Sequence, residues 1–497
     1  MNYPIWEIPA PGLLIAVVAI VHVFIAHVAV GGGLFLVVAE TLLRRERDEP
    51  GLACLATLGD FFVKLSLVLG TLTGVGIWFT ISVVHPAATS WLLDVFLWAW
   101  VIEWVFFAVE VTAALVYYHG WNRLTPSTHL KVGWLYFGSA WLSLAAINGI
   151  LGFMLAPGNW LTTRSFWDGL FNPVYFSTLV ARTATSLVLA GLYVLFAASW
   201  MPAGAGCDRL RKLAAAAYVL PGALILPLTF VWFLASADGA GVSLGEAFGA
   251  KGPGWQGALG VLFQTGAAEG IPMTKTMARV SLGSLAALAA IVAVGLAAHR
   301  ARFGRPVAVL LMLLGFAGIG GGEFVRENLR RPFVLANLML VNGVELPVRG
   351  QGDPSPFSLD SLQRSGALSA ARWVRWPEAV TAARAGREPV RLAPPDDAAE
   401  RGKALFRLEC AWCHTLDGHL GIRKLIEGWD ADSLEEVISG LATPVGADGR
   451  PSAWSEPGVR LETWLGRRMP PFAGTESERR DLAVYLAGVA DSGRRDR

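Results

Sequence analysis

Eight long apolar stretches restrict the fold of this chain more than any other feature. A helix that crosses the ~30 Å hydrocarbon layer of a bilayer needs about 20 mostly apolar residues. The 497 residues are 54% hydrophobic with a mean hydropathy of +0.48, which is too apolar for a water-soluble globule. We therefore expect an all-α fold, a polytopic bundle of about eight transmembrane helices near residues 12–43, 54–84, 91–118, 129–155, 174–200, 209–236, 278–299 and 306–327.

The distribution of basic residues predicts how these spans are oriented. Lys and Arg follow spans one, three, five and seven, whereas the intervening loops at 85–90, 156–173 and 237–277 are poor in both. Because basic loops stay on the cytoplasmic side, the N-terminus is expected outside, and an even number of spans returns the C-terminus to the outside. No Lys or Arg precedes the first span, so we do not interpret it as a cleaved signal. These features predict a multi-pass protein of the inner membrane with both termini in the periplasm.

The near-balanced formal charge of +2 gives no indication that the chain binds nucleic acid.

Cys54 and Cys207 fall at predicted cytoplasmic ends of helices, where disulfides are uncommon, so we expect two inert side chains. The run Gly31–Gly33 allows close helix approach, either within the bundle or to a partner.

The hydrophilic tail carries the motif Cys410-Ala-Trp-Cys413-His414, and Met469 follows 55 residues after the histidine. C-x-x-C-H is the attachment sequence of a c-type haem, in which two thiols bind the vinyl groups and the histidine binds the iron. Met469 is then the expected second axial ligand, the alternative being a core methionine. The predicted topology agrees with this interpretation, because it places the two cysteines in the compartment where thioether attachment occurs.

Helices are expected on both sides of this motif. Asp397-Ala-Ala-Glu400 is typical of a capping box that opens a helix through Phe406, and a last helix is expected near residues 475–491. Contact of Gly402 and Phe406 with Tyr485 and Leu486 is the crossed-helix arrangement of class I cytochrome c, which this segment resembles. We expect a membrane domain (1–343), an irregular periplasmic linker (344–394) and a small all-α cytochrome c domain (395–497), in which His419 is a surface residue.

Ionisable residues inside spans are costly and therefore indicate function. His22 and His27 point about 140° apart on a helix, so they do not bind one metal together. Glu103 and Glu110 share one face about 10 Å apart, which suits a proton path or a further iron ligand. Alternatives are a hydrogen-bonded core role for His27 and an interfacial ion pair with Arg330 or Arg331 for Glu327.

The segment 12–343 resembles subunit I of the cytochrome bd quinol oxidases. His22 with the following Gly-Leu-Phe-Leu run resembles the family's first helix, Gly70-Thr-Leu-Thr-Gly74 its second, and Glu103 and Glu110 with Gly120-Trp-Asn-Arg-Leu its third. Asn172-Pro-Val resembles the entry to the fifth helix, and Glu327-Asn-Leu-Arg-Arg-Pro-Phe resembles the Glu-x-Gly-Arg-Gln-Pro-Trp motif. The resemblance implies that His22 and Glu327 bind the iron of a membrane haem. It also implies functional roles for Glu103 and Glu110, although their spacing is one residue shorter here.

The departures from the family concern its quinol-oxidising half. The histidine that holds the low-spin b haem falls at Ala181 or Arg182, and its methionine partner falls on Ser281. The loop 237–277 is short and lacks the family's Lys and Glu pattern. The ninth helix is replaced by the tail. We therefore expect that the low-spin haem is absent.

Three functions follow as hypotheses. In the first, one covalent haem c passes electrons to one or two b- or d-type haems, which reduce O2 or NO, while Glu103 and Glu110 supply protons. In the second, a quinol dehydrogenase sends electrons outward through haem c, and in the third the chain is a haem-poor anchor for a cytochrome c. A periplasmic cytochrome c or another electron-transfer protein is the expected partner, and the resemblance implies a second membrane subunit of similar fold.

Overall fold

The fold is described from a computed structural model. It covers residues 11–202, 204–239, 272–300, 304–346, 355–370, 385–387, 394–418, 420–441, 443–445, 460–462 and 469–495. Most of the loop 237–277, parts of the predicted linker and His419 lie outside these residues.

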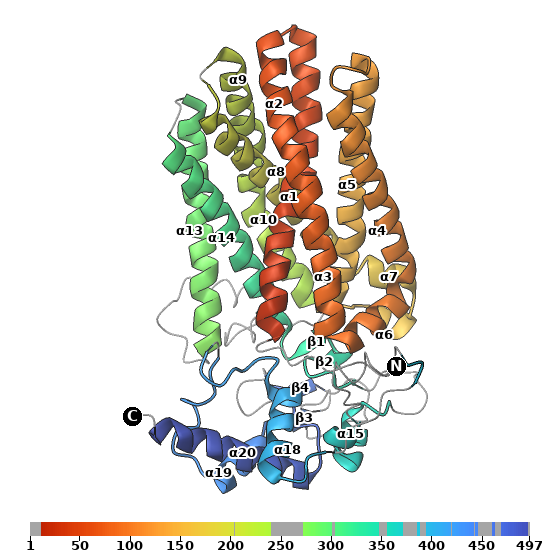
Figure 1. Ribbon diagram of the computed structural model, residues 1–497, viewed down its shortest axis with the longest axis vertical. Coiled ribbons are helices and arrows are strands. Elements are labelled where there is room, and N and C mark those ends of the chain that lie inside the picture. Colours follow the sequence, from red (N-terminus) through yellow and green to blue (C-terminus); the bar gives the residue numbers. More distant parts are fainter. Residues whose placement is uncertain are drawn as a thin grey trace. The chain divides into compact units, whose positions relative to one another are not determined.

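Eight helical segments in the described part of the chain are long and apolar enough to cross a membrane, which confirms the predicted number and positions. The apolar runs are bounded by polar or helix-breaking residues, which end the helices. The segments are α1 (Pro11–Glu46), α2–η1–α3 (Glu49–Leu65, Ser66–Gly70, Thr71–Val84), α4 (Pro86–Gly120), α5 (Pro126–Leu155), α8 (Tyr175–Trp200), α9–η2–α10 (Ala205–Leu213, Ala214–Val219, Leu220–Gly239), α13 (Pro272–Arg300) and α14 (Arg305–Arg330) (Figure 1).

Shorter elements complete the fold. Between α5 and α8 lie α6 (Trp160–Thr163) and α7 (Phe166–Leu170). After α14 follow β1 (Phe333–Leu335), β2 (Met339–Leu340), α15 (Leu359–Ser365), α16 (Ala367–Ala370), α18 (Ala398–Leu405), η3 (Phe406–Cys410), α19 (Ala431–Ser439), β3 (Thr443–Val445), β4 (Arg460–Glu462) and α20 (Glu476–Arg495). β1 pairs antiparallel with β2, and β3 with β4.

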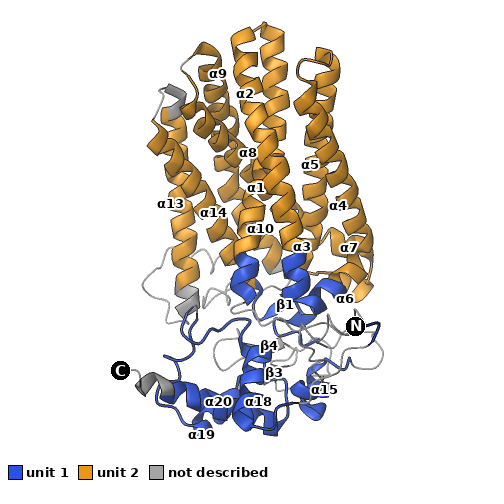
Figure 2. Ribbon diagram, viewed as in Figure 1, with its two compact units in different colours: residues 1–16, 79–91, 330–497 blue, residues 17–78, 92–329 orange. Residues whose placement is uncertain are grey.

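The chain forms two compact units (Figure 2). Unit 2, residues 17–78 and 92–329, contains most of the bundle. Unit 1 combines residues 1–16 and 79–91 with residues 330–497. The tail therefore belongs to the same compact unit as the start of α1 and the junction between α3 and α4.

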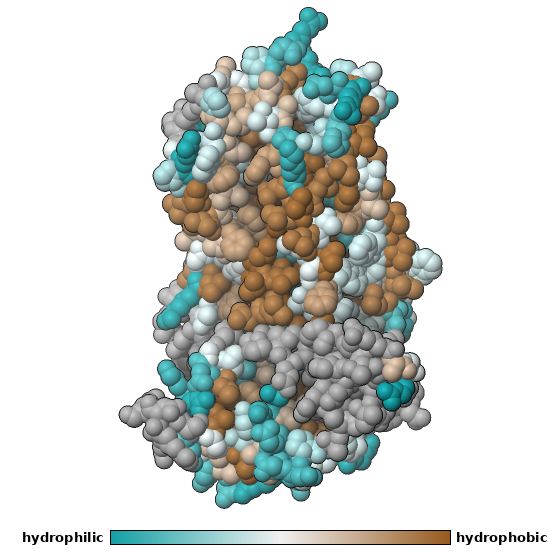
Figure 3. Space-filling view, in the orientation of Figure 1, coloured by the Kyte–Doolittle hydropathy of each residue, from teal (hydrophilic) through white to brown (hydrophobic). Residues whose placement is uncertain are grey.

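The helices of the bundle expose large apolar side chains. Leu72, Trp98 and Leu228 are each about two-thirds exposed or more, at 67%, 68% and 72%. Brown, apolar residues cover much of the bundle in the visible face of Figure 3. Such a surface is unfavourable in water but is expected against lipid.

Three consecutive glycines let α1 approach three different helices. A Cβ on Gly31 would lie 1.9 Å from the backbone oxygen of Ser186 on α8. A Cβ on Gly32 would lie 1.7 Å from the ring of Phe62 on α2, and one on Gly33 would lie 3.1 Å from Tyr136 on α5. Close helix approach inside the bundle, left open by the sequence, thus occurs at all three positions.

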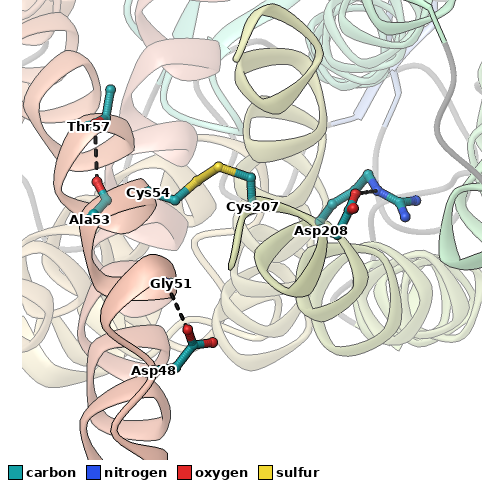
Figure 4. The surroundings of a disulfide bond; sticks show 8 residues. Asp48, Gly51, Ala53, Cys54, Thr57, Cys207 and Asp208 are labelled. Atoms are coloured by element: carbon teal, nitrogen blue, oxygen red, sulfur yellow. Dashed lines mark hydrogen bonds and ion pairs between the residues drawn. A yellow bond between two sulfur atoms is a disulfide. The ribbon is translucent and has the colours of Figure 1, made fainter. Parts of the chain in front are cut away.

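Cys54 and Cys207 form a disulfide, so the expectation of two inert side chains is wrong (Figure 4). Cys54 lies early in α2, and Cys207 lies in the first turn of α9. A Cβ on Gly206 would be 2.5 Å from the backbone of Pro50 and Gly51, so the two helix starts are in close contact. The resulting Cα–Cα distance of 5.6 Å suits a disulfide. The contact between the starts of α2 and α9 is not evident from the sequence, because Cys54 and Cys207 are 153 positions apart.

The predicted helices of the tail are confirmed. The Asp397 side chain accepts a hydrogen bond from the Glu400 N–H at 2.9 Å and caps α18. A Cβ on Gly402 would lie 2.1 Å from the Asp481 backbone oxygen and 2.6 Å from the Tyr485 Cβ, so only glycine allows α18 and α20 to cross here. The rings of Phe406 and Tyr485 are 5.9 Å apart, as expected for the crossed-helix contact.

The predicted linker is not irregular throughout. Its described residues include α15 and α16, and the Ser358 hydroxyl accepts a hydrogen bond from the Ser361 N–H to cap α15. The Glu478 carboxylate of α20 accepts hydrogen bonds from the N–H groups of Ala367 and Leu368, both at 2.8 Å. These short helices therefore pack onto the tail.

We expect Gly31→Val to destabilise the bundle, because the added side chain overlaps the α8 backbone. Overpacking of this kind costs about 1–3 kcal/mol. The measurement is the thermal unfolding temperature of the purified protein in detergent. Gly138→Val on α5 is the control, because no atom lies within 4 Å of a Cβ there. Equal unfolding temperatures for the two variants would contradict the close approach.

Candidate functional site

The cysteine motif of the tail lies in a tight turn after η3. Cys413 N–H and His414 N–H both donate to the Cys410 carbonyl, at 3.1 and 2.9 Å. Neither cysteine is in a disulfide, and both are half-buried. The turn brings the backbone of Cys410, Cys413 and His414 together, and Cys410 packs against the apolar core of the tail, which includes Phe406, Ile426 and Leu486.

The ring of His414 is oriented by a second contact. Its Nδ1 lies 2.9 Å from the Leu420 carbonyl oxygen, which can only accept a hydrogen bond, so Nδ1 carries the proton. The lone pair is then on Nε2, the arrangement of a histidine that binds a metal through Nε2. Two reduced thiols and this tautomer fit a covalently attached haem.

Met469 is half-buried and leads into Pro471, Phe472 and Ala473, which are buried. Phe472 belongs to the same apolar core as Phe406. The chain after Met469 thus returns to the core beside the cysteine motif. Its role as second axial ligand stays a prediction.

The carboxyl of Glu409, next to Cys410, is held by the loop after β2. The Asn342 amide donates to it at 2.6 Å. Burial raises the pKa of Glu409 to about 8, and the Glu478 carboxylate adds to this rise, against the hydrogen bonds from Asn342 and the Ala473 backbone. The raised pKa favours the protonated form of the Glu409 carboxyl.

In the bundle, His22 contacts the glycine-threonine segment that the sequence identified on the second span. His22 Nδ1 lies 3.1 Å from the Thr73 hydroxyl, and this hydroxyl donates to the Leu69 carbonyl at 2.6 Å. The Thr73 oxygen must therefore accept from Nδ1–H, which leaves the lone pair of His22 on Nε2. A Cβ on Gly74 would lie 3.3 Å from the His22 ring. His22 thus has the tautomer of an Nε2 metal ligand.

Glu327 lies near the end of α14, and the helix register shows that it is not level with His22. Phe24 packs on Phe316, and Ile20 on Gly320, so α1 and α14 are antiparallel neighbours. The contact between Ile20 and Gly320 marks one level along the two helices. His22 follows Ile20 on α1, and Glu327 follows Gly320 on α14, so the two residues lie on opposite sides of this level. Together they are nine residues apart, which at the helical rise is about 13 Å along the helix axes. Among the described residues, no group of three or more His, Cys, Asp or Glu side chains forms a metal site.

Glu103 and Glu110 of α4 face α5, which runs antiparallel to α4, and the contacts recur every seven residues along both helices. Ser143 donates a hydrogen bond to Glu103 at 3.2 Å. One repeat along both helices, Tyr136 lies within electrostatic range of Glu110. The shared face predicted from the sequence is thus confirmed. One repeat further, Tyr117 stacks on His129 with ring centroids 4.1 Å apart. We call these three pairs the polar seam.

Glu40 of α1, which the sequence analysis did not single out, lies at one end of this seam. Its carboxylate accepts hydrogen bonds from Tyr117 Oη at 2.8 Å and Arg44 Nε at 2.6 Å. His129 Nδ1 is 2.8 Å from one carboxylate oxygen, and His129 Nε2 is 2.9 Å from the Tyr117 carbonyl. Both ring nitrogens of His129 thus face oxygen atoms, Nδ1 the Glu40 carboxylate and Nε2 the Tyr117 carbonyl.

The position expected for the low-spin haem ligand contains an ion cluster. Arg182 of α8 lies 3.8 Å from Glu323 of α14, and Arg326 Nε donates to Glu323 at 2.8 Å. Ser281, at the expected methionine position, is buried on α13, and near it a Cβ on Gly321 would lie 2.3 Å from the Ser284 hydroxyl. The helices are thus close together at these positions. His27 is a buried core residue whose Nδ1 donates to the Val23 carbonyl at 2.6 Å.

The missed residues had a sequence signal. Glu40 and His129 are ionisable residues at the ends of predicted spans, and the rule that an intramembrane charge needs a partner applies to them. The spacing that makes them neighbours of Tyr117 is only evident once α1, α4 and α5 are placed together.

We expect Glu40→Ala to lower the free energy of unfolding by about 3–5 kcal/mol, because it leaves Arg44, Tyr117 and His129 without their shared carboxylate. The measurement is thermal unfolding in detergent. Asp60→Ala is the control, since Asp60 pairs with Lys64 at 2.9 Å on an exposed surface and such pairs contribute about 0–1 kcal/mol. A loss no greater than that of the control would contradict the cluster's structural role.

The Glu409 carboxyl predicts a pH dependence of tail stability. Its folded pKa of about 8 lies above the ordinary value of 4.5, so its proton favours the folded state. The stabilisation that this proton gives the folded tail is complete at pH values below 4.5. It is lost as the pH rises through the folded pKa of about 8. We expect the unfolding temperature of the tail, followed by near-ultraviolet circular dichroism, to fall over this range in the natural protein. The fall should be smaller in Glu409→Gln, and exposed Glu436→Gln should retain it.

Comparison with known proteins supports the arrangement of the bundle. Residues 13–251 match the family model of cytochrome bd terminal oxidase subunit I. The chain is similar to the structure of bd oxidase from Geobacillus thermodenitrificans, with 16% identity over 67% of this chain and 89% of that chain and a TM-score of 0.52, a likeness that establishes the fold. No curated protein matched. The chain is therefore a multi-pass membrane protein whose residues 13–251 resemble subunit I of the cytochrome bd oxidases and whose bundle has the fold of that structure.

Proposed function

We propose that the chain is the electron-transfer subunit of a bd-like terminal reductase that takes electrons through a covalent haem c and reduces O2 or NO at haem in the membrane. Cys410 and Cys413 would hold haem c, with His414 and Met469 as its iron ligands. A c-type haem supplies one-electron chemistry. The fit of the thiols and of the His414 tautomer supports this assignment.

The observation that carries the proposal is the ion cluster of Arg182, Glu323 and Arg326. An arginine cannot replace a histidine as an iron ligand, because its guanidinium stays protonated and has no lone pair to donate. The low-spin haem through which the resembled family takes electrons from quinol thus lacks its ligand on α8. The cysteine motif supplies a one-electron entrance instead.

His22 and Glu327 are the proposed iron ligands in the membrane. Their separation of about 13 Å along the helices favours two haem positions over a single iron held between them. We therefore favour two b- or d-type haems, one at each residue.

The polar seam is the proposed proton supply. Reduction of O2 consumes protons, and a path through apolar helices requires hydrogen-bonding side chains. Glu103 and Glu110 face Ser143 and Tyr136 along one line, and the contact between Glu40 and His129 lies at the end of that line. In the predicted orientation this end is cytoplasmic, and the cysteine motif is periplasmic. A second membrane subunit of similar fold and a periplasmic electron donor are the proposed partners.

The test combines haem analysis with electron-donor specificity. The pyridine haemochrome spectrum of the purified protein should show one c-type haem together with b- or d-type haem. Oxygen uptake should be supported by reduced cytochrome c and not by a quinol. A preference for quinol as the electron donor would favour the reverse function, a quinol dehydrogenase. A spectrum with one c-type haem and no other haem would show that the chain is only a membrane anchor for a cytochrome c.

His22→Ala provides the matched variant for the membrane haem. It should abolish CO binding to that haem while the c-type spectrum stays unchanged. His27→Ala, which alters a neighbouring buried histidine that bonds its own helix, should retain CO binding. An unchanged CO difference spectrum in His22→Ala would contradict the proposed ligand.

A further inference from the structure

Trp412 lies between the two cysteines of the haem motif, so its backbone is fixed to the edge of any group attached to both thiols. Within unit 1, this residue contacts two of the membrane-helix segments. Its ring centroid is 4.7 Å from that of His85, at the junction of α3 and α4. Its carbonyl oxygen would lie 2.8 Å from a Cβ on Gly12, in the first turn of α1.

His85 is held in one orientation and one tautomer. Its side chain is buried, with 7% exposure. Nδ1 accepts a hydrogen bond from the Ala88 N–H at 3.2 Å, so Nε2 must carry the proton that it donates to the Val341 carbonyl at 3.2 Å. His85 is therefore a neutral ring, fixed by the backbone on both sides.

The segment after β2 connects the same elements. Val341 accepts the hydrogen bond from His85, and the next residue, Asn342, donates to Glu409 at 2.6 Å, one residue before Cys410. Val341 N–H also donates to the Pro332 carbonyl at 2.9 Å, which fixes this segment to the chain leaving α14. The haem motif is thus held by the start of α1, the α3–α4 junction and the segment after β2.

We propose that Trp412 and His85 form an electron port, the contact through which electrons pass between the haem motif and the membrane helices. This inference rests on the proposed function. It also specifies that the tail contacts the start of α1 and the α3–α4 junction, which belong to the same compact unit.

The port has a simple physical basis. The rate of electron tunnelling falls steeply as the gap between electron donor and acceptor grows. Two aromatic rings in contact leave a shorter gap than the same space filled with solvent. Haem bound at the cysteine motif and haem bound in the membrane would each supply one-electron chemistry, and Trp412 and His85 would bridge the gap between them. No bond forms or breaks in Trp412 or His85, and both nitrogens of His85 keep their hydrogen bonds.

The test measures electron transfer in the haem-loaded full chain after rapid mixing with ascorbate and a redox mediator. The c-type and membrane-haem absorption bands are followed separately. Trp412→Ala and His85→Ala should each lose the fast transfer phase from c-type to membrane haem, and Trp412→Phe and His85→Phe should keep it. The double alanine variant should be no slower than either single variant, because both remove one contact.

A second readout does not depend on electron transfer. Gly12→Val should displace the haem motif without altering either ring of the port. It should increase hydrogen exchange in segments 338–346 and 409–414. Gly283→Val is the control, since no atom lies within 4 Å of a Cβ there. Trp429→Ala, a partly exposed tryptophan of the tail, controls for loss of an aromatic residue.

The outcomes separate the port from the proposed function. Fast transfer in the natural protein that persists in Trp412→Ala and His85→Ala, with unchanged exchange in Gly12→Val, would overturn the port and leave the function standing. No transfer to a membrane haem in the natural protein would overturn the function, and the port with it. Loss of the fast phase with unchanged haem c content would support the port.

Discussion

An ionisable side chain in the membrane must find its partner within the protein, because lipid offers no hydrogen bonds. This constraint explains the polar positions of the bundle. Glu40 is fully buried and is contacted by Arg44, Tyr117 and His129. The second cluster, around Glu323, connects α8 to α14. Each cluster connects distant parts of the chain, so the same contacts that satisfy charge also determine which helices are neighbours.

Close packing around α1 places the proposed haem ligand His22 and the polar seam in one bundle. Gly31, Gly32 and Gly33 remove side-chain volume on three sides, so α8, α2 and α5 all approach the same short segment of α1. Glu40 lies seven residues after Gly33, on the side facing α5, and His22 lies nine residues before Gly31. The helix that carries the proposed haem ligand is therefore also the helix that completes the polar seam.

The tail is incorporated in the fold more fully than its composition indicates. Its sequence is typical of a linker and a small cytochrome domain, and the helix cap at Asp397 and the crossing at Gly402 follow that pattern. The short segment after β2 contacts both His85 and Glu409, and this arrangement has no periodic signal. Two or three residues per strand are too few to show an alternation of apolar and polar side chains.

The sequence by itself determined the eight spans, the cysteine motif, the capped helices of the tail and the shared face of Glu103 and Glu110. Each of these depends on local composition or helical spacing, which a linear sequence contains. Only the tertiary structure decided that Cys54 bonds Cys207, that Arg182 pairs with Glu323 and that Trp412 contacts His85. These contacts join residues more than a hundred positions apart, and their formation depends on which helices pack together and in which register. No local pattern in the chain specifies that choice.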